Sequence, residues 1–128
     1  MRSTDSVIYK IVPAALWRAS EAAGRFAGSP VDVGDGFIHF STAAQVRETA
    51  ARHFSGVTDL VLVAVLTAAI EGPAFRWEPS RGGDLFPHLY ADLPLGAVRW
   101  VRPLPFDAEG RHVFPALEEV TTAARTSV

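Results

Sequence analysis

The stretch LVLVAVL, residues 60–66, is an unbroken apolar run of strand length. Because apolar and polar residues do not alternate in it, the run predicts a central β-strand that is covered on both faces. Such a strand needs neighbouring strands in its own sheet and further layers above and below. The rest of the chain is therefore expected to supply both around this stretch.

Before this run, VIYKIV at residues 7–12 is rich in β-branched and aromatic residues and predicts a second strand, with Pro13 suited to begin a helix. The segment that follows, up to Phe26, predicts an amphipathic helix packed on the sheet. Its apolar residues at helical spacing are Leu16, Ala19, Ala23 and Phe26. The next segment, SPVDVGDG at residues 29–36, is rich in turn formers and predicts a loop.

The segment DGFIHFSTAAQ, residues 35–45, places a histidine in a short predicted strand directly before a helix. Strand alternation puts Phe37, His39 and Ser41 on one face. Thr42 and Gln45 have the spacing of a capping box. The helix they begin has one apolar face, made of Ala43, Val46, Ala50 and Phe54.

Residues 74–115 read as short runs separated by proline and glycine. The predicted strands are AFRWE, DLFPHLY, VRWVRPL and RHVFP, with a helical turn at LPLGAV. Two main helices early and most strands late predict an α+β fold with a mixed or antiparallel sheet, on which the two helices pack. We expect one domain over residues 1–117 and a polar C-terminal tail over 118–128.

The composition is that of a globular domain, because 48% of the 128 residues are hydrophobic and 20% are charged. The net charge is −2 and the arginines are scattered, which argues against binding to duplex DNA.

With no cysteine in the chain, disulfides, thiolate zinc sites and cysteine nucleophiles are excluded. No apolar run approaches the roughly 20 residues of a membrane helix or resembles a signal peptide, so we expect a cytoplasmic protein without membrane contact.

The stretch RWEPSRGGDLFPHLY, residues 76–90, brings further polar chemistry. Alternation in its second half sets Phe86, His88 and Tyr90 on one face. Two histidines with a nearby acid suffice for orienting a ligand and for acid–base chemistry near neutral pH. We therefore predict His39, Glu78 and His88 as catalytic residues. No metal is predicted, because no two histidines are spaced i, i+4 on a helix.

The predicted ligand is a phosphorylated small molecule. The backbone N–H groups at the start of the helix near Thr42 suit a phosphate, and arginines could neutralise its charge. Aromatic side chains could help to orient the ligand. The predicted substrate-binding residues are Ser41, Thr42, Arg52, Trp77, Arg81, Phe86 and Tyr90.

Each candidate also has an ordinary structural interpretation. A histidine at position 39 can hydrogen-bond within a core, and Ser41 and Thr42 can simply cap a helix. Glu78 can pair with a neighbouring arginine, while the aromatic residues can belong to the core or to a sheet rim. Every functional interpretation requires His39 and His88 to share one cleft.

Taken together, DGFIHFST, RWEPSRGGDLFPHLY and AVRWVRPLPFD resemble the bacterial family known as domain of unknown function 952, over about residues 6–117. The resemblance implies a fold like the catalytic domain of ADP-ribosyltransferases, with a cleft for NAD or an ADP-ribose-like ligand. In it, His39 would hold the ribose of the nicotinamide half, assisted by Ser41 or Thr42. Glu78 precedes the position of the late acid of that superfamily, and Ala91 stands where the family commonly has glycine.

The function implied is an NAD-using enzyme that transfers ADP-ribose, or a related phosphotransferase. The alternative is a non-catalytic module that binds a nucleotide or another small metabolite. A third hypothesis is a hydrolase or transferase unrelated to NAD, such as a glutathione transferase. No residues of the chain support the glutathione transferase. Release of nicotinamide separates the first hypothesis from the second, and an unrelated ligand in the cleft would favour the third.

Overall fold

The computed structural model describes residues 5–118, except for the side chain of Arg81. Its helices are α1 (Ala14–Ala23), α2 (Pro30–Asp35) and α3 (Ala43–His53), with 3-10 turns η1 (Thr67–Ala69), η2 (Arg81–Gly83) and η3 (Leu95–Ala97). Its strands are β1 (Val7–Pro13), β2 (Arg25–Phe26), β3 (Ile38–His39), β4 (Leu60–Leu66), β5 (Phe75–Ser80), β6 (Asp84–Leu89), β7 (Leu93–Pro94) and β8 (Val98–Pro103).

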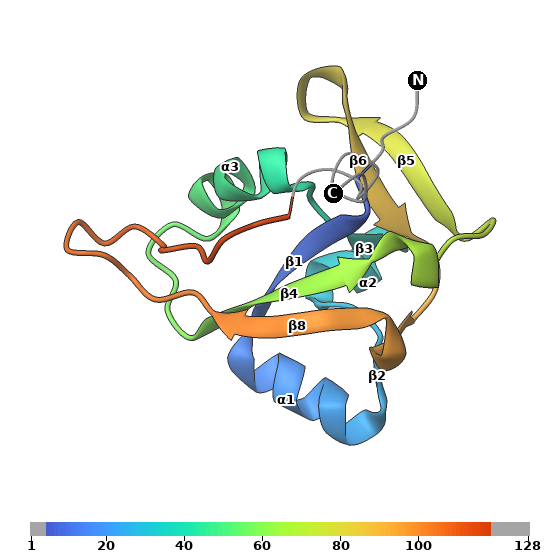
Figure 1. Ribbon diagram of the computed structural model, residues 1–128, viewed down its shortest axis with the longest axis horizontal. Helices are drawn as coiled ribbons and strands as arrows, with labels where there is room; N and C mark the ends of the chain where they lie inside the picture. Colours follow the sequence, from blue (N-terminus) through green and yellow to red (C-terminus); the bar gives the residue numbers. More distant parts are fainter. Residues whose placement is uncertain (1–4, 119–128) are drawn as a thin grey trace, which may run out of the picture.

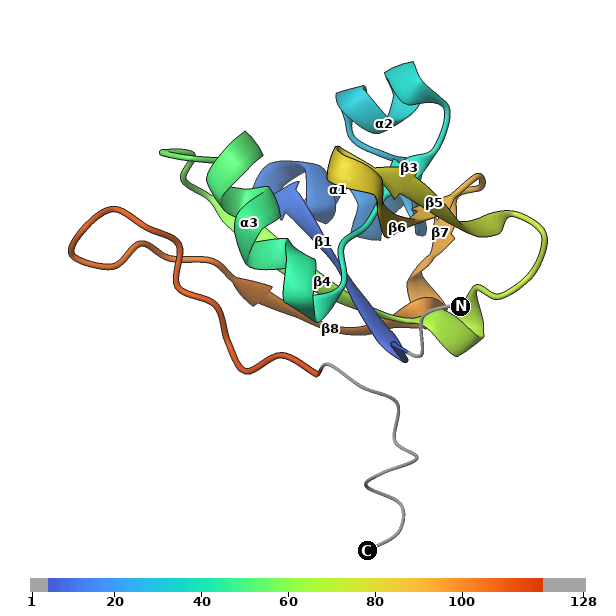
Figure 2. The ribbon, with the colours of Figure 1, turned by 90° about the horizontal axis from the view of Figure 1, so that it is seen from above.

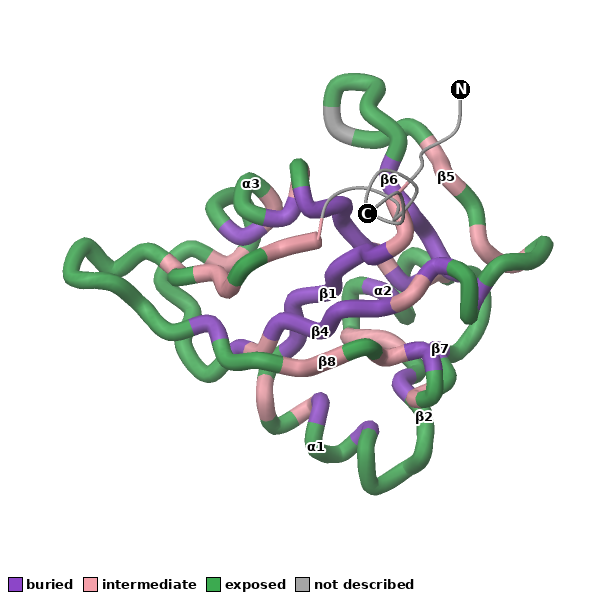
Figure 3. The backbone as a smooth tube through the Cα atoms, in the orientation of Figure 1, coloured by how far each residue is buried: buried purple, intermediate pink, exposed green. Residues whose placement is uncertain are grey.

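Strand β4 is the centre of an antiparallel sheet with the order β1-β4-β8, as the apolar run predicted (Figure 1). Val63 and Val65 belong to one apolar cluster, which also contains Trp17 of α1. Leu62 belongs to a second cluster, which also contains Val46 of α3. Both faces of the sheet are therefore covered, and the backbone along β1, β4 and β6 is largely buried (Figure 3).

A second antiparallel sheet has the order β3-β6-β5, and β2 pairs with β7. A bridge between Tyr9 and Ser41 connects β1 to the chain just after β3. Helix α2 lies beside β3, on the side of the molecule away from β8 (Figure 2). The α+β class, the antiparallel pairing and the packing of the two longer helices are thus confirmed.

Helix α3 agrees with its prediction. It follows Thr42, whose backbone N–H donates to Oε1 of Gln45 at 3.0 Å. Its buried residues include Val46 and Ala50, which lie one turn apart on the face toward the sheet. The predicted helical turn within residues 93–98 is also present, as η3.

Other local predictions were wrong. In α1 the buried residues are Trp17 and Ser20, while Ala19 and Ala23 are exposed, because the large indole ring turns a different face to the core. The helix ends before Gly24, whose φ is 87°, so Phe26 lies in β2.

The predicted loop at residues 29–36 contains α2, and the reason is local capping. Pro30 stands at its start, and the backbone N–H and hydroxyl of Ser29 both donate to Oδ2 of Asp32, at 2.8 and 3.0 Å. The predicted strand RHVFP is also absent; of it only the bridge between Phe106 and His112 forms. Residues 119–128 of the predicted tail lie outside the described residues.

Candidate functional site

His39 of β3 and His88 of β6 are direct partners in the antiparallel register. Partners of this kind point to the same face of a sheet, and their ring centroids lie 5.5 Å apart. Ile38 and Phe40, which alternate with His39, enter the core instead. The two histidines that the sequence singled out are therefore neighbours in space.

The ring of Phe37 packs against this pair. Its centroid lies 4.4 Å from that of His39, 4.2 Å from that of His88 and 5.0 Å from that of Tyr90. These contacts restrict the orientation of both imidazoles, because each ring has a close apolar neighbour. Phe37 was predicted on the same strand face as His39 but was not among the predicted site residues.

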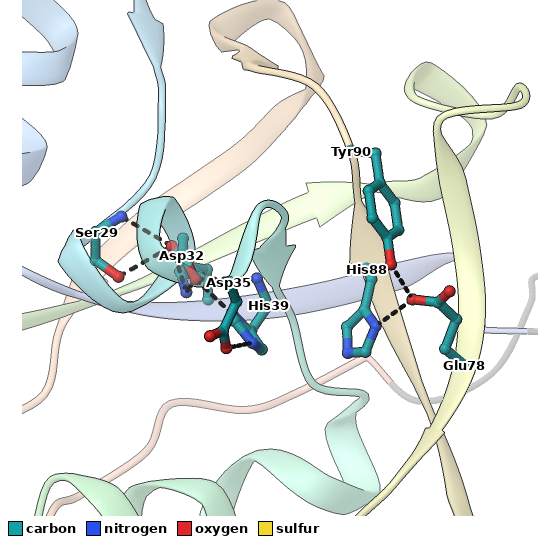
Figure 4. A network of polar contacts seen from close by, with 8 residues as sticks. Ser29, Asp32, Asp35, His39, Glu78, His88 and Tyr90 are labelled. Atoms are coloured by element: carbon teal, nitrogen blue, oxygen red, sulfur yellow. Dashed lines mark hydrogen bonds and ion pairs between the residues drawn. The ribbon is translucent and has the colours of Figure 1, made fainter.

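His39 lies between two carboxylates (Figure 4). Its Nδ1 is 2.7 Å from Oδ1 of Asp32, and its Nε2 is 2.9 Å from Oδ2 of Asp35. Because ionised carboxylates only accept hydrogen bonds, each of the two ring nitrogens of His39 faces an acceptor.

Asp32 is the buried anchor of this group, with only 2% of its side chain exposed. Nζ of Lys10 lies 2.9 Å from its carboxylate, and the backbone N–H of His39 donates to it at 3.1 Å. Burial by itself works to raise the pKa of Asp32, but the hydrogen bond from His39 and the charge of Lys10 outweigh burial and hold that pKa well below its usual range. Asp32 is therefore a fixed anion under His39.

His88 has a different set of neighbours. Its Nδ1 lies 2.7 Å from Oε1 of Glu78, which also accepts from the hydroxyl of Tyr90 at 2.8 Å (Figure 4). The bonds from His88 and Tyr90 lower the pKa of Glu78, and the bond to Glu78 raises the pKa of Tyr90. Burial lowers the pKa of His88, against the opposing effect of Glu78. His88 is therefore favoured as a neutral ring that donates from Nδ1 and leaves a lone pair on Nε2.

Two further predicted residues lie on the same face. Phe86 is buried and is the register partner of Glu78. Tyr90 is partly exposed, and the guanidinium of Arg76 lies 4.7 Å from the centroid of its ring. A cation and an aromatic rim thus border the histidine pair.

The structure places four of the remaining predicted residues, Trp77, Ser41, Thr42 and Arg52, in other surroundings. Trp77 lies on the opposite face of β5 and packs against the core. The hydroxyl of Ser41 contacts that of Thr49 at 2.8 Å, and Thr42 caps α3. Arg52 is exposed and pairs with Glu48 on α3. The side chain of Arg81 lies outside the described part of the chain.

Four charged residues of the site were missed by sequence reasoning: Lys10, Asp32, Asp35 and Arg76. Lys10 is the one charged residue in the apolar strand VIYKIV, and a buried lysine requires a partner. Asp32 follows Ser29 at capping-box spacing, a helix-start signal inside the supposed loop. Both signals were present, but nothing in the sequence connects them to His39.

The arrangement joins hydrogen-bond donors, a ring nitrogen with a free lone pair, and aromatic surface. Among residues 5–118, the side chain of Arg81 excepted, Nε2 of His88 has no hydrogen-bond partner, so it can accept a proton from a bound group. Within the same residues, no group of three or more His, Asp or Glu side chains is arranged to hold a metal ion. None of the described helices is both long and apolar enough to cross a membrane.

Two solved structures similar to this chain come from one protein of Caulobacter crescentus, CC0527. Its crystal structure is 42% identical, with a TM-score of 0.79, over 95% of this chain and 99% of that one. Its solution NMR structure is 49% identical, with a TM-score of 0.74, over 83% and 90% of the two chains. No curated protein matches the chain significantly. Residues 11–101 match the family described as "Protein of unknown function (DUF952)", and the chain therefore belongs to that family.

Proposed function

We propose that this protein binds NAD or an ADP-ribose-like nucleotide at the face formed by His39, His88, Phe37 and Tyr90. We further propose that its fold is related to the catalytic domain of ADP-ribosyltransferases, and that it transfers ADP-ribose or acts as a related phosphotransferase. The observation that carries the proposal is the side-by-side placement of His39 and His88, with centroids 5.5 Å apart. The motifs around these two histidines carry the resemblance to the family.

The chemistry of the face suits such a ligand. His39 can donate hydrogen bonds from its ring, which suits the oxygens of a ribose and its adjoining phosphate. The ring of Tyr90 is partly exposed and lies under the guanidinium of Arg76, so this rim offers a cation to the phosphates of the ligand. When bound, NAD would supply a glycosidic bond with nicotinamide as leaving group.

His88 supports an enzymatic function over simple binding. Its Nδ1 is held by Glu78, which leaves Nε2 as the acceptor for a proton from an attacking hydroxyl. A carboxylate that orients an imidazole in this way is a recurrent feature of general bases. Glu78 would then be a positioning residue, and His88 the catalytic base.

The second candidate is a non-catalytic nucleotide-binding module. It is favoured by Glu78, whose Oε1 already accepts two hydrogen bonds and is not free to contact a ribose. In that case the histidines would orient a ligand that is bound and released unchanged.

The test is calorimetric titration of the purified protein with NAD and with ADP-ribose. We expect saturable binding that His39→Ala loses, after circular dichroism has confirmed its fold. His53→Ala is the matched control, since His53 is exposed at the end of α3. Absence of binding to the wild type would refute the nucleotide site. If NAD binds, nicotinamide release that falls at least about a hundredfold in His88→Gln separates the enzyme from the binding module.

A further inference from the structure

The two carboxylates on His39 are held very differently. Asp32 is buried and has polar contacts with Lys10, Ser29 and both the backbone and the ring of His39. Asp35 is 53% exposed, and among residues 5–118, the side chain of Arg81 excepted, the one polar side-chain partner of its carboxylate is Nε2 of His39. The carboxylate of Asp32 is therefore part of the buried core, while that of Asp35 contacts the ring of His39 from the solvent side.

The position of Asp35 is the one from which a ligand would approach. Nδ1 of His39 is closed off by the buried Asp32, so Nε2 is the ring nitrogen that can serve a ligand. That nitrogen now donates to an anionic oxygen at 2.9 Å, a distance typical of a charge-assisted hydrogen bond. An oxygen of an anionic ligand would make the same contact.

The charges of the site agree with an anionic ligand. If Asp35 moves away, the ammonium of Lys10 and the guanidinium of Arg76 face the carboxylates of Asp32 and Glu78, and Nε2 of His39 loses its acceptor. The site then carries one negative charge fewer than with Asp35 in place. Departure of Asp35 thus removes a charge that would repel an anionic ligand.

We propose that Asp35 is an internal stand-in for a phosphate oxygen of the ligand, which binds Nε2 of His39 after displacing the Asp35 carboxylate. This inference rests on the proposed function and adds that the Asp35 carboxylate competes with the ligand for Nε2 of His39. Because Nε2 of His88 is directed toward the side of His39 in Figure 4, a phosphate at His39 brings the neighbouring part of the ligand to the catalytic base. An anion therefore occupies the site only when it binds Nε2 of His39 more strongly than the Asp35 carboxylate does.

The experiment follows binding of inorganic pyrophosphate, ADP-ribose, malonate and adenosine by NMR titration of the histidine ring signals. Asp35→Ala removes the competitor, and Asp35→Asn is a second variant that keeps the shape without the charge. Asp92→Ala is the matched control, because Asp92 has 50% of its side chain exposed and pairs with Arg25, not with either histidine. We expect Asp35→Ala to bind pyrophosphate and ADP-ribose about tenfold more tightly than wild type. This is the gain that follows when the Asp35 carboxylate occupies Nε2 of His39 in roughly nine of ten wild-type molecules.

Several results would overturn the role of Asp35 as a competitor of phosphate. Adenosine, which lacks phosphate, should gain nothing from Asp35→Ala, and a gain equal to that of ADP-ribose would overturn the inference. Equal or weaker pyrophosphate binding in both Asp35 variants would also overturn it, as would an equal gain in Asp92→Ala. Stronger binding of malonate than of pyrophosphate would overturn the assignment to phosphate.

Failure of the inference is distinguishable from failure of the proposed function. If pyrophosphate binds more tightly to the Asp35 variants while neither NAD nor ADP-ribose binds at all, the nucleotide function is wrong and the competitor role stands. If NAD binds the wild type and the Asp35 variants equally, the nucleotide site stands and the competitor role is wrong.

Discussion

His39 and His88 occupy paired positions in neighbouring strands, yet among the side chains that the structure describes the ring of His39 contacts two carboxylates and the ring of His88 contacts one. The difference comes from their strands. β3 follows α2, which contributes Asp32 and Asp35, whereas β6 pairs with β5, which contributes Glu78. Two histidines in register thereby have different hydrogen-bond partners, because both ring nitrogens of His39 face a carboxylate whereas Nδ1 of His88 faces Glu78.

Replacing Lys10 with methionine should lower the free energy of unfolding by about 3–5 kcal/mol, because the buried carboxylate of Asp32 loses its cation. Urea unfolding at pH 7 measures this. Arg52→Met is the control, since Arg52 forms an exposed ion pair with Glu48, and its loss should cost less than about 1 kcal/mol. Equal effects of the two substitutions would show that the buried pair contributes no more to the free energy of unfolding than the exposed pair does.

Stability should fall in acid through Asp32. Its pKa is depressed in the folded protein relative to about 3.9 in the unfolded chain, so its contribution is fully present above about pH 4 and is lost as the pH falls further. Urea unfolding of wild type and Asp32→Asn between pH 3 and pH 7 tests this. The variant should be less stable at pH 7, and the gap should narrow toward pH 3; a constant gap would contradict the prediction.

His88 should add a second pH dependence at higher pH. Burial lowers its pKa in the folded protein, so the unfolded chain takes up a proton first, and stability falls as the pH drops through about 6.5. His88→Gln should remove this part of the profile between pH 8 and pH 5.5. If wild type and His88→Gln lose stability in parallel over that range, His88 does not titrate as proposed.

Phe37→Ala should loosen both imidazoles, because the ring of Phe37 lies within 4.4 Å of each, centroid to centroid. The histidine ring proton signals should move toward their unfolded values as the ring current of Phe37 disappears. Binding of ADP-ribose, where present, should weaken about tenfold, the effect of misplacing one charge-assisted bond. Phe37→Tyr, which keeps an aromatic ring, should preserve the signals; similar shifts in both variants would argue against packing as the cause.

The main features of the fold were predictable where periodicity and burial agree. The run at residues 60–66 is apolar throughout and became the central strand, and the segment from Thr42 carries both a capping signal and a one-sided apolar pattern. The first helix was harder, because spacing treats Ala19 and Trp17 alike although burying an indole yields far more free energy. Helix α2 was missed because its turn-forming composition outweighed the capping pair at Ser29 and Asp32 in the prediction.

The sequence by itself determined the α+β class, the central strand, and the strand face on which each of His39, His88 and Tyr90 lies. These depend on neighbours along the chain, through the two-residue period of a strand and the turn-to-turn spacing of a helix. Only the tertiary structure decided that His39 and His88 are register partners and that Lys10 reaches Asp32, with its nitrogen 2.9 Å from the carboxylate. Register between strands and the pairing of buried charges are chosen by the packing of the whole core, because segments far apart in the chain must share it.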